Sequence, residues 1–178
     1  MRVLIVALLV TVLAACVAGP TGNSSVPEPA KRVDLQRYKG LWYEFARYEN
    51  RFEKDCEAVT AQYTPQPDGV IAVKNSCHEA TVDGPLRVSE GKAKPAGDPK
   101  GAKLKVSFFG PALMTNYWVL DHGDAYDWAI VGEGSGRYLW ILTRQAQPSA
   151  QERVELIARA KALGYDTDML RYTEQPAR

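Results

Sequence analysis

The sequence has no clear excess of charge of either sign and contains few histidines and cysteines. Its 178 residues include 22 Lys and Arg, 21 Asp and Glu, two His and three Cys. Without residues 1–15, which contain Arg2 and no acid, basic and acidic residues are equal in number. Because nucleic-acid affinity depends on clustered positive charge, this balance argues against a nucleic-acid partner. His78 and His122 are few for a metal site or a base-driven enzyme, so we expect neither a metal nor another cofactor.

Two motifs that carry chemistry in other proteins are incomplete in this chain. Gly132, Gly134 and Gly136 alternate with other residues, whereas a dinucleotide-binding loop requires a different glycine spacing and a helix after it. Ser135 has Glu133 and Arg137 at the positions where an esterase nucleophile turn carries glycine. We therefore interpret this stretch as a turn between two strands.

Only one long apolar run is present, and it lies at the start of the chain. It extends from Val3 to Val12 and leads into Leu13-Ala14-Ala15-Cys16. A helix of about 13 residues would be ~20 Å long, which is too short for the ~30 Å hydrocarbon layer of a bilayer. We therefore interpret residues 1–15 as a signal peptide that is removed.

The end of this peptide resembles the bacterial lipobox. That resemblance implies that Cys16 becomes the acylated first residue, and several acyl chains give stable anchoring where one chain gives only marginal anchoring. Val17 is not aspartate, which implies sorting to the outer membrane, with the folded domain in the periplasm. An ordinary secretory peptide that happens to contain a cysteine is the alternative. Residues 16–32 are rich in Gly, Pro and Ser, so we expect them to form a flexible tether.

Short alternating runs separated by turn residues fill the middle of the chain. Cys56–Tyr63 and Val70–Cys77 flank a segment with two prolines, an aspartate and a glycine, which predicts a β-hairpin. Cys56 and Cys77 then lie at matching distances from the turn, as cross-strand partners. In an oxidising compartment we expect them to form a disulfide, and two buried free thiols are the alternative.

The later runs have the same short, regularly punctuated pattern. Further strands are expected at residues 78–89, 91–94, 103–108, 116–120, 126–131 and 138–143. No helical pattern interrupts them, which favours an antiparallel meander, and closure into a barrel would remove exposed edges. One loop region is locally basic, with Lys92, Lys94, Lys100, Lys103 and Lys105. We interpret it as a solvated face, and contact with lipid phosphates is the alternative.

A single amphipathic helix is predicted late in the chain. Ser149 and Glu152 have the spacing of a capping box, in which each side chain satisfies a backbone donor at the helix start. One helical stripe carries Leu156, Ile157, Ala160 and Leu163. Gly164 is placed to end the helix, and residues 165–172 can follow as a short extra strand.

The run that begins at Gly40 carries the motif around which the chain is organised. Gly40-Leu41-Trp42 opens an aromatic strand, and Tyr138–Arg144 is a second strand that closes on an arginine. Between them Thr115-Asn116-Tyr117 leads into Asp121. In their order and spacing these motifs resemble those of the lipocalin family, most closely its bacterial outer-membrane members. The domain to which the resemblance applies is assigned to residues 33–175.

The resemblance implies an all-β fold, namely an eight-stranded antiparallel up-and-down barrel with one C-terminal α-helix packed outside. In that family the tryptophan, here Trp42, packs across the closed end, and the arginine, here Arg144, lies over its ring. Gly40 and Asp121 complete the structural signature. Asn116 stands where the family usually carries aspartate, which would remove a charge from the closed end.

The same resemblance implies a carrier that stores or transports a fatty acid or lysophospholipid in the cell envelope. A small barrel has room for one modest ligand among apolar and aromatic side chains. The side chains expected at the ligand are Phe108, Tyr117, Trp118, Trp128, Tyr138, Trp140 and Leu142. Strand alternation allows only about half of the late aromatic residues to face inward.

Two other classes of function are considered beside the carrier. An enzyme, an isomerase or esterase acting in the same cavity, is one, but the sequence offers no matched nucleophile and base. A surface interaction module that uses its loops around a filled barrel is the other. A homodimer is left open as a further partner.

Overall fold

The computed structural model describes residues 20–110 and 113–177, and the predicted signal peptide and the lipid attachment at Cys16 lie outside them. The order of elements is α1 (Leu35–Tyr38), β1 (Gly40–Tyr48), β2 (Cys56–Pro65), β3 (Ile71–Glu79), β4 (Leu86–Pro95), β5 (Lys103–Ser107), β6 (Thr115–His122), β7 (Trp128–Gly132), β8 (Leu139–Thr143), α2 (Ala150–Ala162), the 3₁₀ helix η1 (Thr167–Met169) and β9 (Leu170–Tyr172). In the described part of the chain no helix has the length and apolar character needed to cross a bilayer.

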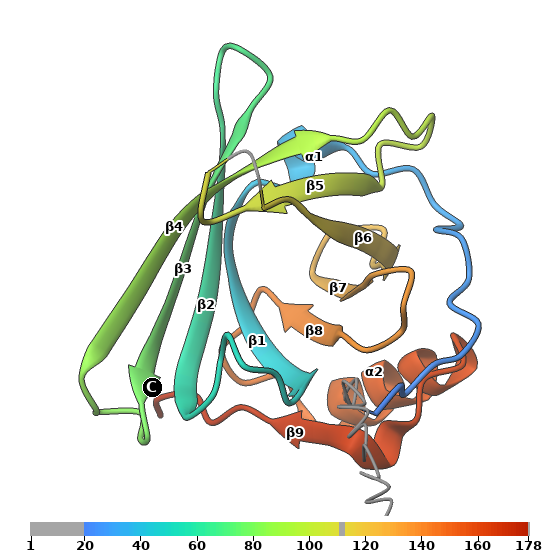
Figure 1. Cartoon of the computed structure of the whole chain (residues 1–178). Coiled ribbons are helices and arrows are strands. Elements are labelled where there is room, and N and C mark those ends of the chain that lie inside the picture. Colours follow the sequence, from blue (N-terminus) through green and yellow to red (C-terminus); the bar gives the residue numbers. More distant parts are fainter. Residues whose placement is uncertain (1–19, 111–112, 178) are drawn as a thin grey trace, which may run out of the picture.

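The first eight strands form a closed antiparallel barrel (Figure 1). Each strand pairs with the next, and β1 closes the sheet by pairing with both β2 and β8. A bulge between Glu44 and Ala46 divides β1. Its first part pairs with β2, and its last part pairs with the additional strand β9. The predicted fold class, an eight-stranded up-and-down barrel with one C-terminal helix, is confirmed.

The connections between strands lie at two ends of the barrel. Because neighbouring strands are antiparallel, the β1–β2, β3–β4, β5–β6 and β7–β8 connections share one end, which we call the mouth. The β2–β3, β4–β5 and β6–β7 connections share the other end with α1, which precedes β1. We call this second end the closed end.

Two apolar clusters lie on opposite faces of the barrel wall, as the twofold alternation of strands requires. On β7, Ala129 and Val131 belong to an inner cluster, while Ile130 between them belongs to an outer cluster. Other buried members of the inner cluster are Val73, Ala93, Leu104, Val106, Val119 and Leu142. The outer cluster is covered by α2, which contributes Leu156 and Ala160 (Figure 1).

The predicted capping box explains where α2 begins. The Ser149 hydroxyl accepts from the Glu152 N–H at 3.2 Å, and the Glu152 carboxylate accepts from the Ser149 N–H at 2.7 Å. Two backbone donors that a helix start leaves unpaired are thereby satisfied. Gly164 follows the helix with φ of +90°, a conformation that glycine adopts without steric cost.

Cys56 and Cys77 form the predicted disulfide, with their Cα atoms 5.4 Å apart. They are not directly opposite each other, as the sequence suggested, because Cys56 lies opposite Glu79. A bulge between Glu57 and Thr60 shifts the register of β2 against β3. A bulge of this kind inserts a residue without changing the pattern of turn residues, so the sequence offered no signal for it.

The segment before α1 follows the outside of the barrel (Figure 1). Near its start, the N–H groups of Gly22 and Asn23 donate to the Gly136 carbonyl in the β7–β8 connection at 3.1 and 3.2 Å. Near its end, Lys31 Nζ donates to the carbonyl of His122 at 2.7 Å. The segment therefore extends from the mouth to the closed end.

Over residues 20–32 this course differs from the flexible tether that we expected, and residues 16–19 lie outside the described part of the chain. The fit is close, because a Cβ added to Gly136 would lie 1.8 Å from the Asn23 carbonyl oxygen. Composition predicted flexibility since the segment has few apolar side chains. Its contacts are made largely by backbone groups and reach loops more than 100 residues away, which composition does not report.

The disulfide generates a prediction about stability. Replacing both Cys56 and Cys77 by alanine removes a cross-link with a sequence separation of 21 residues. We expect the free energy of unfolding to fall by about 3 kcal/mol, because the unfolded chain regains loop entropy. Thermal melting should shift down by about 6–12 °C. Reductant should lower the melting temperature of the parent protein by a similar amount and should not affect that of the variant. A variant that melts at the same temperature as the oxidised parent protein would contradict the prediction.

Candidate functional site

The closed end is built on Trp42, whose side chain is fully buried. Its Nε1 donates to the Tyr38 carbonyl at 2.8 Å, and the Arg144 guanidinium carbon lies 3.7 Å from the centre of its ring. Such a cation–π contact contributes roughly 0.5–2 kcal/mol, depending on desolvation. Gly40 adjoins this contact, with φ of +95° and with Arg144 Nη1 3.5 Å from where a Cβ would stand.

Arg144 also joins three elements through its donors. Its Nη1 donates to the Leu41 carbonyl at 2.6 Å, and its Nε donates to the Tyr126 carbonyl at 3.1 Å. Its Nη2 lies 2.9–3.1 Å from the carbonyl oxygens of Arg37, Tyr38 and Lys39. The last barrel strand is therefore tied to β1, to the β6–β7 connection and to α1, which closes this end of the barrel.

Three tyrosine hydroxyls meet inside the barrel, and the ring of one of them, Tyr38, lies 4.9 Å from that of Trp42. The Tyr117 hydroxyl lies 2.7 Å from that of Tyr38 and 2.8 Å from that of Tyr63. Burial raises the pKa of Tyr38 and of Tyr117 well above the ordinary value, and it raises the pKa of Tyr63 to about 12. All three hydroxyls are therefore neutral near neutral pH. The inner end of the site is polar without being charged.

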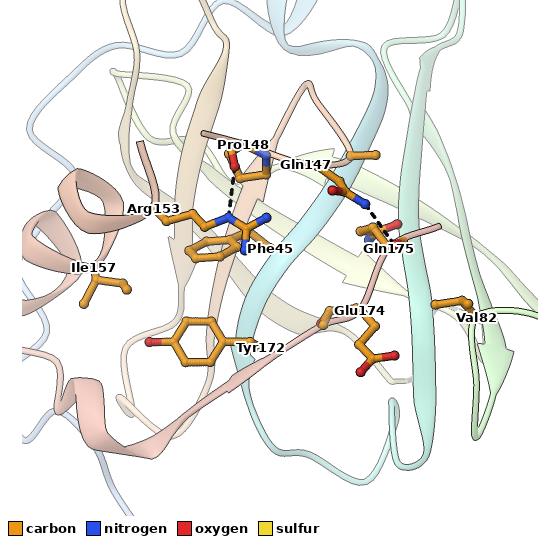
Figure 2. Close-up of a pocket in the computed structure, with 11 residues that line it drawn as sticks. Phe45, Val82, Gln147, Pro148, Arg153, Ile157, Tyr172, Glu174 and Gln175 are labelled. Carbon is orange, nitrogen blue, oxygen red and sulfur yellow. Dashed lines mark hydrogen bonds between the residues drawn. The ribbon is translucent and has the colours of Figure 1, made fainter. Parts of the chain in front are cut away.

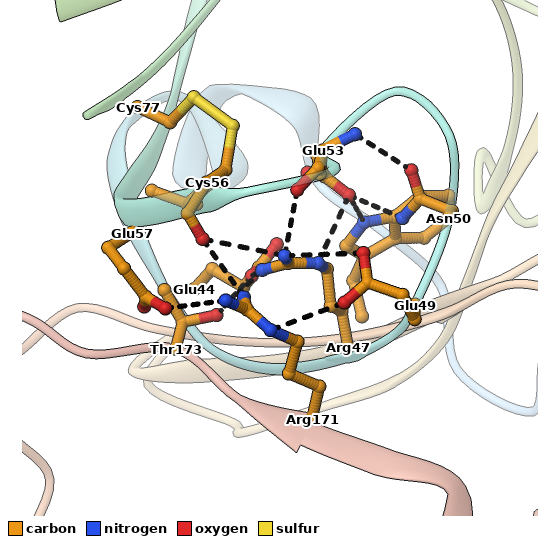
Figure 3. Close-up of polar contacts among 12 residues, drawn as sticks. Glu44, Arg47, Glu49, Asn50, Glu53, Cys56, Glu57, Cys77, Arg171 and Thr173 are labelled. Carbon is orange, nitrogen blue, oxygen red and sulfur yellow. Dashed lines mark hydrogen bonds and ion pairs between the residues drawn. A yellow bond between two sulfur atoms is a disulfide. The ribbon is translucent and has the colours of Figure 1, made fainter. Parts of the chain in front are cut away.

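A charged cluster lies in the half of the barrel toward the mouth (Figure 3). Arg47, which is fully buried, donates from Nη1 to Glu44 Oε1 at 2.7 Å and from Nη2 to the Glu53 carbonyl at 2.8 Å. Thr173 contacts Glu44 and also accepts from Arg47 at 3.1 Å. Trp140 Nε1 donates to Glu53 Oε2 at 2.8 Å, which links the cluster to the inner wall.

Carboxylates outnumber guanidinium groups in this cluster. Arg171 lies 3.2 Å from Glu49 and 2.5 Å from Glu57, so its single positive charge is shared between two acids. Glu44 and Glu53 then share Arg47. The pKa of Glu44 is raised to about 8, chiefly by burial and then by the charge of Glu53, while Arg47 and Thr173 act in the opposite direction. We therefore treat Glu44 as protonated near neutral pH.

A separate groove of about 540 Å³ lies outside the barrel between α2, β9 and the C-terminal residues (Figure 2). The Phe45 ring forms one side, with the Tyr172 ring 5.5 Å away and the Arg153 guanidinium 5.7 Å away. Arg153 Nε donates to the Pro148 carbonyl at 2.9 Å. The groove is distinct from the inner wall because Phe45 belongs to the outer cluster.

The structure brings four of the seven expected ligand residues to the inner cluster. Phe108, Tyr117 and Trp140 pack against it while remaining partly exposed, and Leu142 is buried within it. Tyr138 stacks on Trp140, with ring centres 5.7 Å apart and ring planes inclined by 5°. Tyr138 is partly exposed and precedes β8, so it lies at the mouth beside Trp140.

Trp118 and Trp128 lie on the opposite face of the wall, which corrects the expectation that they line the ligand site. Both pack against the outer cluster. Lys103 Nζ lies 3.8 Å from the centre of a Trp118 ring, and the Arg159 guanidinium lies 4.7 Å from that of Trp128. Each tryptophan precedes an inward-facing residue, Val119 or Ala129, so strand alternation turns the tryptophan outward. We therefore exclude both tryptophans from the candidate site.

The middle signature motif also lies elsewhere than expected. Thr115 and Asn116 begin β6 at the mouth, and Asn116 accepts from Lys105 on the outside of the barrel. Because Asn116 lies at the mouth, having asparagine in place of aspartate at this position does not remove a charge from the closed end, contrary to what we expected. Asp121, near the other end of β6, lies 3.3 Å from Lys31 and 3.7 Å from Arg159. Its contacts hold the N-terminal segment and α2 to the barrel.

Several residues of the site were not identified from the sequence. Tyr38 and Tyr63 meet Tyr117, but they come from α1 and β2, and nothing local marks them. Glu44 and Arg47 were visible only as polar residues in an aromatic strand. The bulge after Glu44 changes the alternation, so that both side chains face the interior. In a regular strand, residues three positions apart face opposite sides. A pair of opposite charges at that spacing, such as Glu44 and Arg47, is therefore a weak signal for a bulge between them.

The histidines show no arrangement for proton transfer in the barrel. His122 is buried at the closed end, and its two ring nitrogens lie 2.8 and 3.0 Å from the carbonyl oxygens of Gly123 and Arg32. His78 Nδ1 lies 2.8 Å from the Gly84 carbonyl. Among residues 20–110 and 113–177, no three His, Cys, Asp or Glu side chains are grouped to hold a metal ion.

A family model described as a lipocalin-like domain matches residues 33–175 of the chain. The outer membrane lipoprotein Blc of Escherichia coli (strain K12) is 38% identical over 175 residues, which cover 95% of this chain and 98% of that protein. Temperature-induced lipocalin-1 of Arabidopsis thaliana is 37% identical over 155 residues, which cover 83% and 82% of the two chains.

Solved structures show the same fold at lower identity. Insecticyanin from the tobacco hornworm Manduca sexta superposes with a TM-score of 0.68 at 21% identity, covering 88% of each chain. Lobster apocrustacyanin A1 superposes with a TM-score of 0.62 at 22% identity, covering 87% of this chain and 93% of that one.

The contacts of Arg144 predict a large effect of a conservative change. In Arg144→Lys the charge remains, but one ammonium cannot reach the carbonyl oxygens of both β1 and the β6–β7 connection. We expect the free energy of unfolding to fall by about 2–3 kcal/mol, as measured by urea titration. Arg137→Lys, at an exposed site on the mouth, serves as the control and should change it by less than about 0.5 kcal/mol. Equal stability of the two variants would contradict the role given to Arg144.

The charge cluster predicts how stability depends on pH. The pKa of Glu44 is about 8 in the folded protein and 4.5 as its ordinary value, so the folded state holds this proton more tightly. Stability from this group is therefore greatest below about pH 4.5 and is lost as pH rises toward 8. Glu44→Gln should flatten the dependence of the melting temperature on pH in this window and raise the melting temperature at pH 8.

The control is Glu90→Gln, at an exposed position on β4. It should keep the pH dependence of the parent protein. If Glu44→Gln melted below the parent protein at pH 8, Glu44 would have to be ionised in the folded state.

Proposed function

This chain belongs to the lipocalin family, and from that membership we propose that it is a lipid-binding protein of the outer membrane that stores or moves fatty acids or lysophospholipids. Its E. coli relative is named an outer membrane lipoprotein and matches it over almost its whole length. The sequence of Leu13-Ala14-Ala15-Cys16 supports the same location, through acylation of Cys16.

The observation that carries the proposal is the division of the barrel interior into an apolar wall and two polar regions. The wall is lined by small and medium aliphatic side chains such as Ala93, Val119 and Val131. Burial of an acyl chain against such a wall contributes ~0.8 kcal/mol per CH₂. The neutral tyrosine hydroxyls lie deep in the barrel, and the charged cluster lies toward the mouth, where a headgroup would remain.

The charge balance of the cluster favours a zwitterionic headgroup over a free carboxylate. With Glu44 protonated, the three acids Glu49, Glu53 and Glu57 still outnumber the two bases Arg47 and Arg171, so the cluster holds more negative than positive charge. A fatty-acid carboxylate placed there would add a further negative charge. The ammonium group of a lysophospholipid would instead be attracted by Glu53, which has 17% of its side chain exposed. We therefore expect a lysophospholipid to bind more tightly than a fatty acid of equal chain length.

Nothing in the described residues supports the enzyme alternative with an assembled site. The histidine rings contact backbone carbonyl oxygens, and Cys56 and Cys77 are joined to each other. A bonded sulfur is not a nucleophile. The binding function therefore remains the one proposed.

The test is competition between an introduced side chain and the ligand. Ala93 is fully buried in the inner wall, and Lys94 next to it is exposed on the same strand. In Ala93→Phe the ring should occupy interior space and lower the affinity for 1-palmitoyl-lysophosphatidylethanolamine at least about tenfold, whereas Lys94→Phe should leave it unchanged. Native mass spectrometry and displacement of a fluorescent fatty acid would measure both.

Stability distinguishes the possible outcomes. If the interior is free for ligand, Ala93→Phe should melt within a few degrees of the parent protein. If the interior is filled by side chains, overpacking should cost about 1–3 kcal/mol and lower the melting temperature. If the parent protein bound neither palmitate nor the lysophospholipid, the proposed function would be wrong.

A further inference from the structure

The direction in which the N-terminal segment leaves the barrel is set by its first contacts. Gly22 and Asn23 donate to the Gly136 carbonyl at the mouth, and Asn23 Nδ2 donates to the Leu163 carbonyl at 2.9 Å. The Asp166 N–H in turn donates to the Gly22 carbonyl at 2.8 Å. The chain that precedes Gly22 therefore starts from the mouth.

The other end of the segment is held at the closed end. Lys100 Nζ donates to the Pro29 carbonyl at 2.7 Å, and the Val33 N–H donates to the Lys100 carbonyl at 2.8 Å. The segment cannot slide along the wall without breaking contacts at both ends. Its orientation is therefore a property of the fold.

The length of chain before Gly22 limits where an anchor on Cys16 can lie. Six residues fully extended span at most ~20 Å. The nine residues of β1 are about 30 Å long, and a tilt of about 40° leaves a barrel about 23 Å tall. A membrane that holds Cys16 can therefore meet the mouth, but the chain is too short to bring the closed end flat against it.

The mouth is also where exposed apolar side chains gather. Of nine large hydrophobic side chains that are exposed among the described residues, six lie on mouth connections or at the adjoining strand ends, namely Phe52, Leu86, Val88, Phe109, Leu113 and Met114. Phe109 is 76% exposed, and Leu86 and Leu113 are each 63% exposed. At the closed end Leu41 is the exposed residue of this kind within residues 20–110 and 113–177.

Charge does not account for this distribution. The mouth connections carry charges of both signs, with a small acidic excess: three bases (Arg51, Lys54, Arg137) stand against five acids (Glu49, Glu53, Asp55, Asp83, Glu133). Two of the basic residues near the closed end are engaged with the N-terminal segment, since Lys103 pairs with Glu28 at 2.6 Å and Lys100 contacts Pro29. A surface that is apolar and has no basic excess fits the interior of a lipid layer better than an anionic polymer.

We infer that the mouth lies on the bilayer to which the chain is anchored, with Phe109 and Leu113 inserted among the lipids. The occupant of this apolar rim is a phospholipid surface. The inference rests on the proposed function, because it requires acylation at Cys16 and a lipid ligand. It adds that the ligand passes between membrane and barrel without crossing water.

Depth of insertion tests the orientation directly. The acylated full-length chain is placed in phosphatidylethanolamine–phosphatidylglycerol vesicles, with a polarity-sensitive fluorophore on Leu113→Cys, on Val154→Cys in α2 or on Lys94→Cys at the closed end. We expect a blue shift and quenching by spin-labelled lipids at position 113, and neither at positions 154 and 94. Quenching at position 94 without quenching at 113, or at no position in vesicle-bound protein, would overturn the inference.

Transfer of ligand provides the second test. Phe109→Asp combined with Leu113→Asp should slow transfer of 1-palmitoyl-lysophosphatidylethanolamine from vesicles to the anchored protein at least about tenfold. Its affinity for the same ligand in detergent solution should be unchanged. Val154→Asp, which places the same charge on an exposed apolar site of α2, should leave both unchanged. An unchanged transfer rate in the double variant would count against insertion at the mouth.

The two proposals can fail separately. Protein that is vesicle-bound and binds lysophospholipid but shows no quenching at position 113 refutes only the orientation. Protein that binds neither vesicles nor lysophospholipid refutes the proposed function, and the orientation falls with it.

Discussion

The contact between Arg144 and Trp42 is the constraint on which the barrel depends. A closed sheet needs its last strand to meet its first, and here a single guanidinium group covers the indole while donating to carbonyl oxygens on α1, β1 and the β6–β7 connection. These oxygens belong to three parts of the chain that the guanidinium group holds together. One side chain therefore fixes the closed end and leaves the mouth as the entrance.

The side chains that line the interior change in chemical character from the closed end to the mouth. Neutral tyrosine hydroxyls come first, an aliphatic wall follows, and the buried Arg47 with its acids lies nearest the mouth. Buried ion pairs seldom add stability over apolar packing, because desolvation offsets the attraction between the charges. The position of this ion pair beside Trp140 agrees with the headgroup recognition that we propose. The apolar rim and the course of the N-terminal segment lie at the same end of the barrel, where we infer contact with the bilayer.

Local patterns predicted the elements better than they predicted their faces. The hairpin of β2 and β3 and the capping box of α2 follow from turn residues and from side chains three positions apart, and both are present. Alternation predicted that only about half of the late aromatic residues face inward. It could not say which half, because a shift of one residue exchanges the two faces. The bulge in β1 shifts the alternation of inward and outward side chains by one residue. Glu44 and Arg47 therefore both face inward, which the sequence pattern did not predict.

The sequence by itself determined the barrel class, the pairing of Trp42 with Arg144 and the disulfide, because each depends on residue types at short or characteristic spacings. The lipid anchor at Cys16 stays a prediction. Tertiary structure alone decided that Trp118 and Trp128 face α2, that Tyr38 and Tyr63 join Tyr117, and that residues 22–32 lie along the wall. These arrangements depend on groups that are distant in sequence and on backbone carbonyl oxygens, which every residue carries alike. The pattern of side chains in the sequence cannot predict these arrangements, because one of the two groups in many of the contacts is a backbone atom.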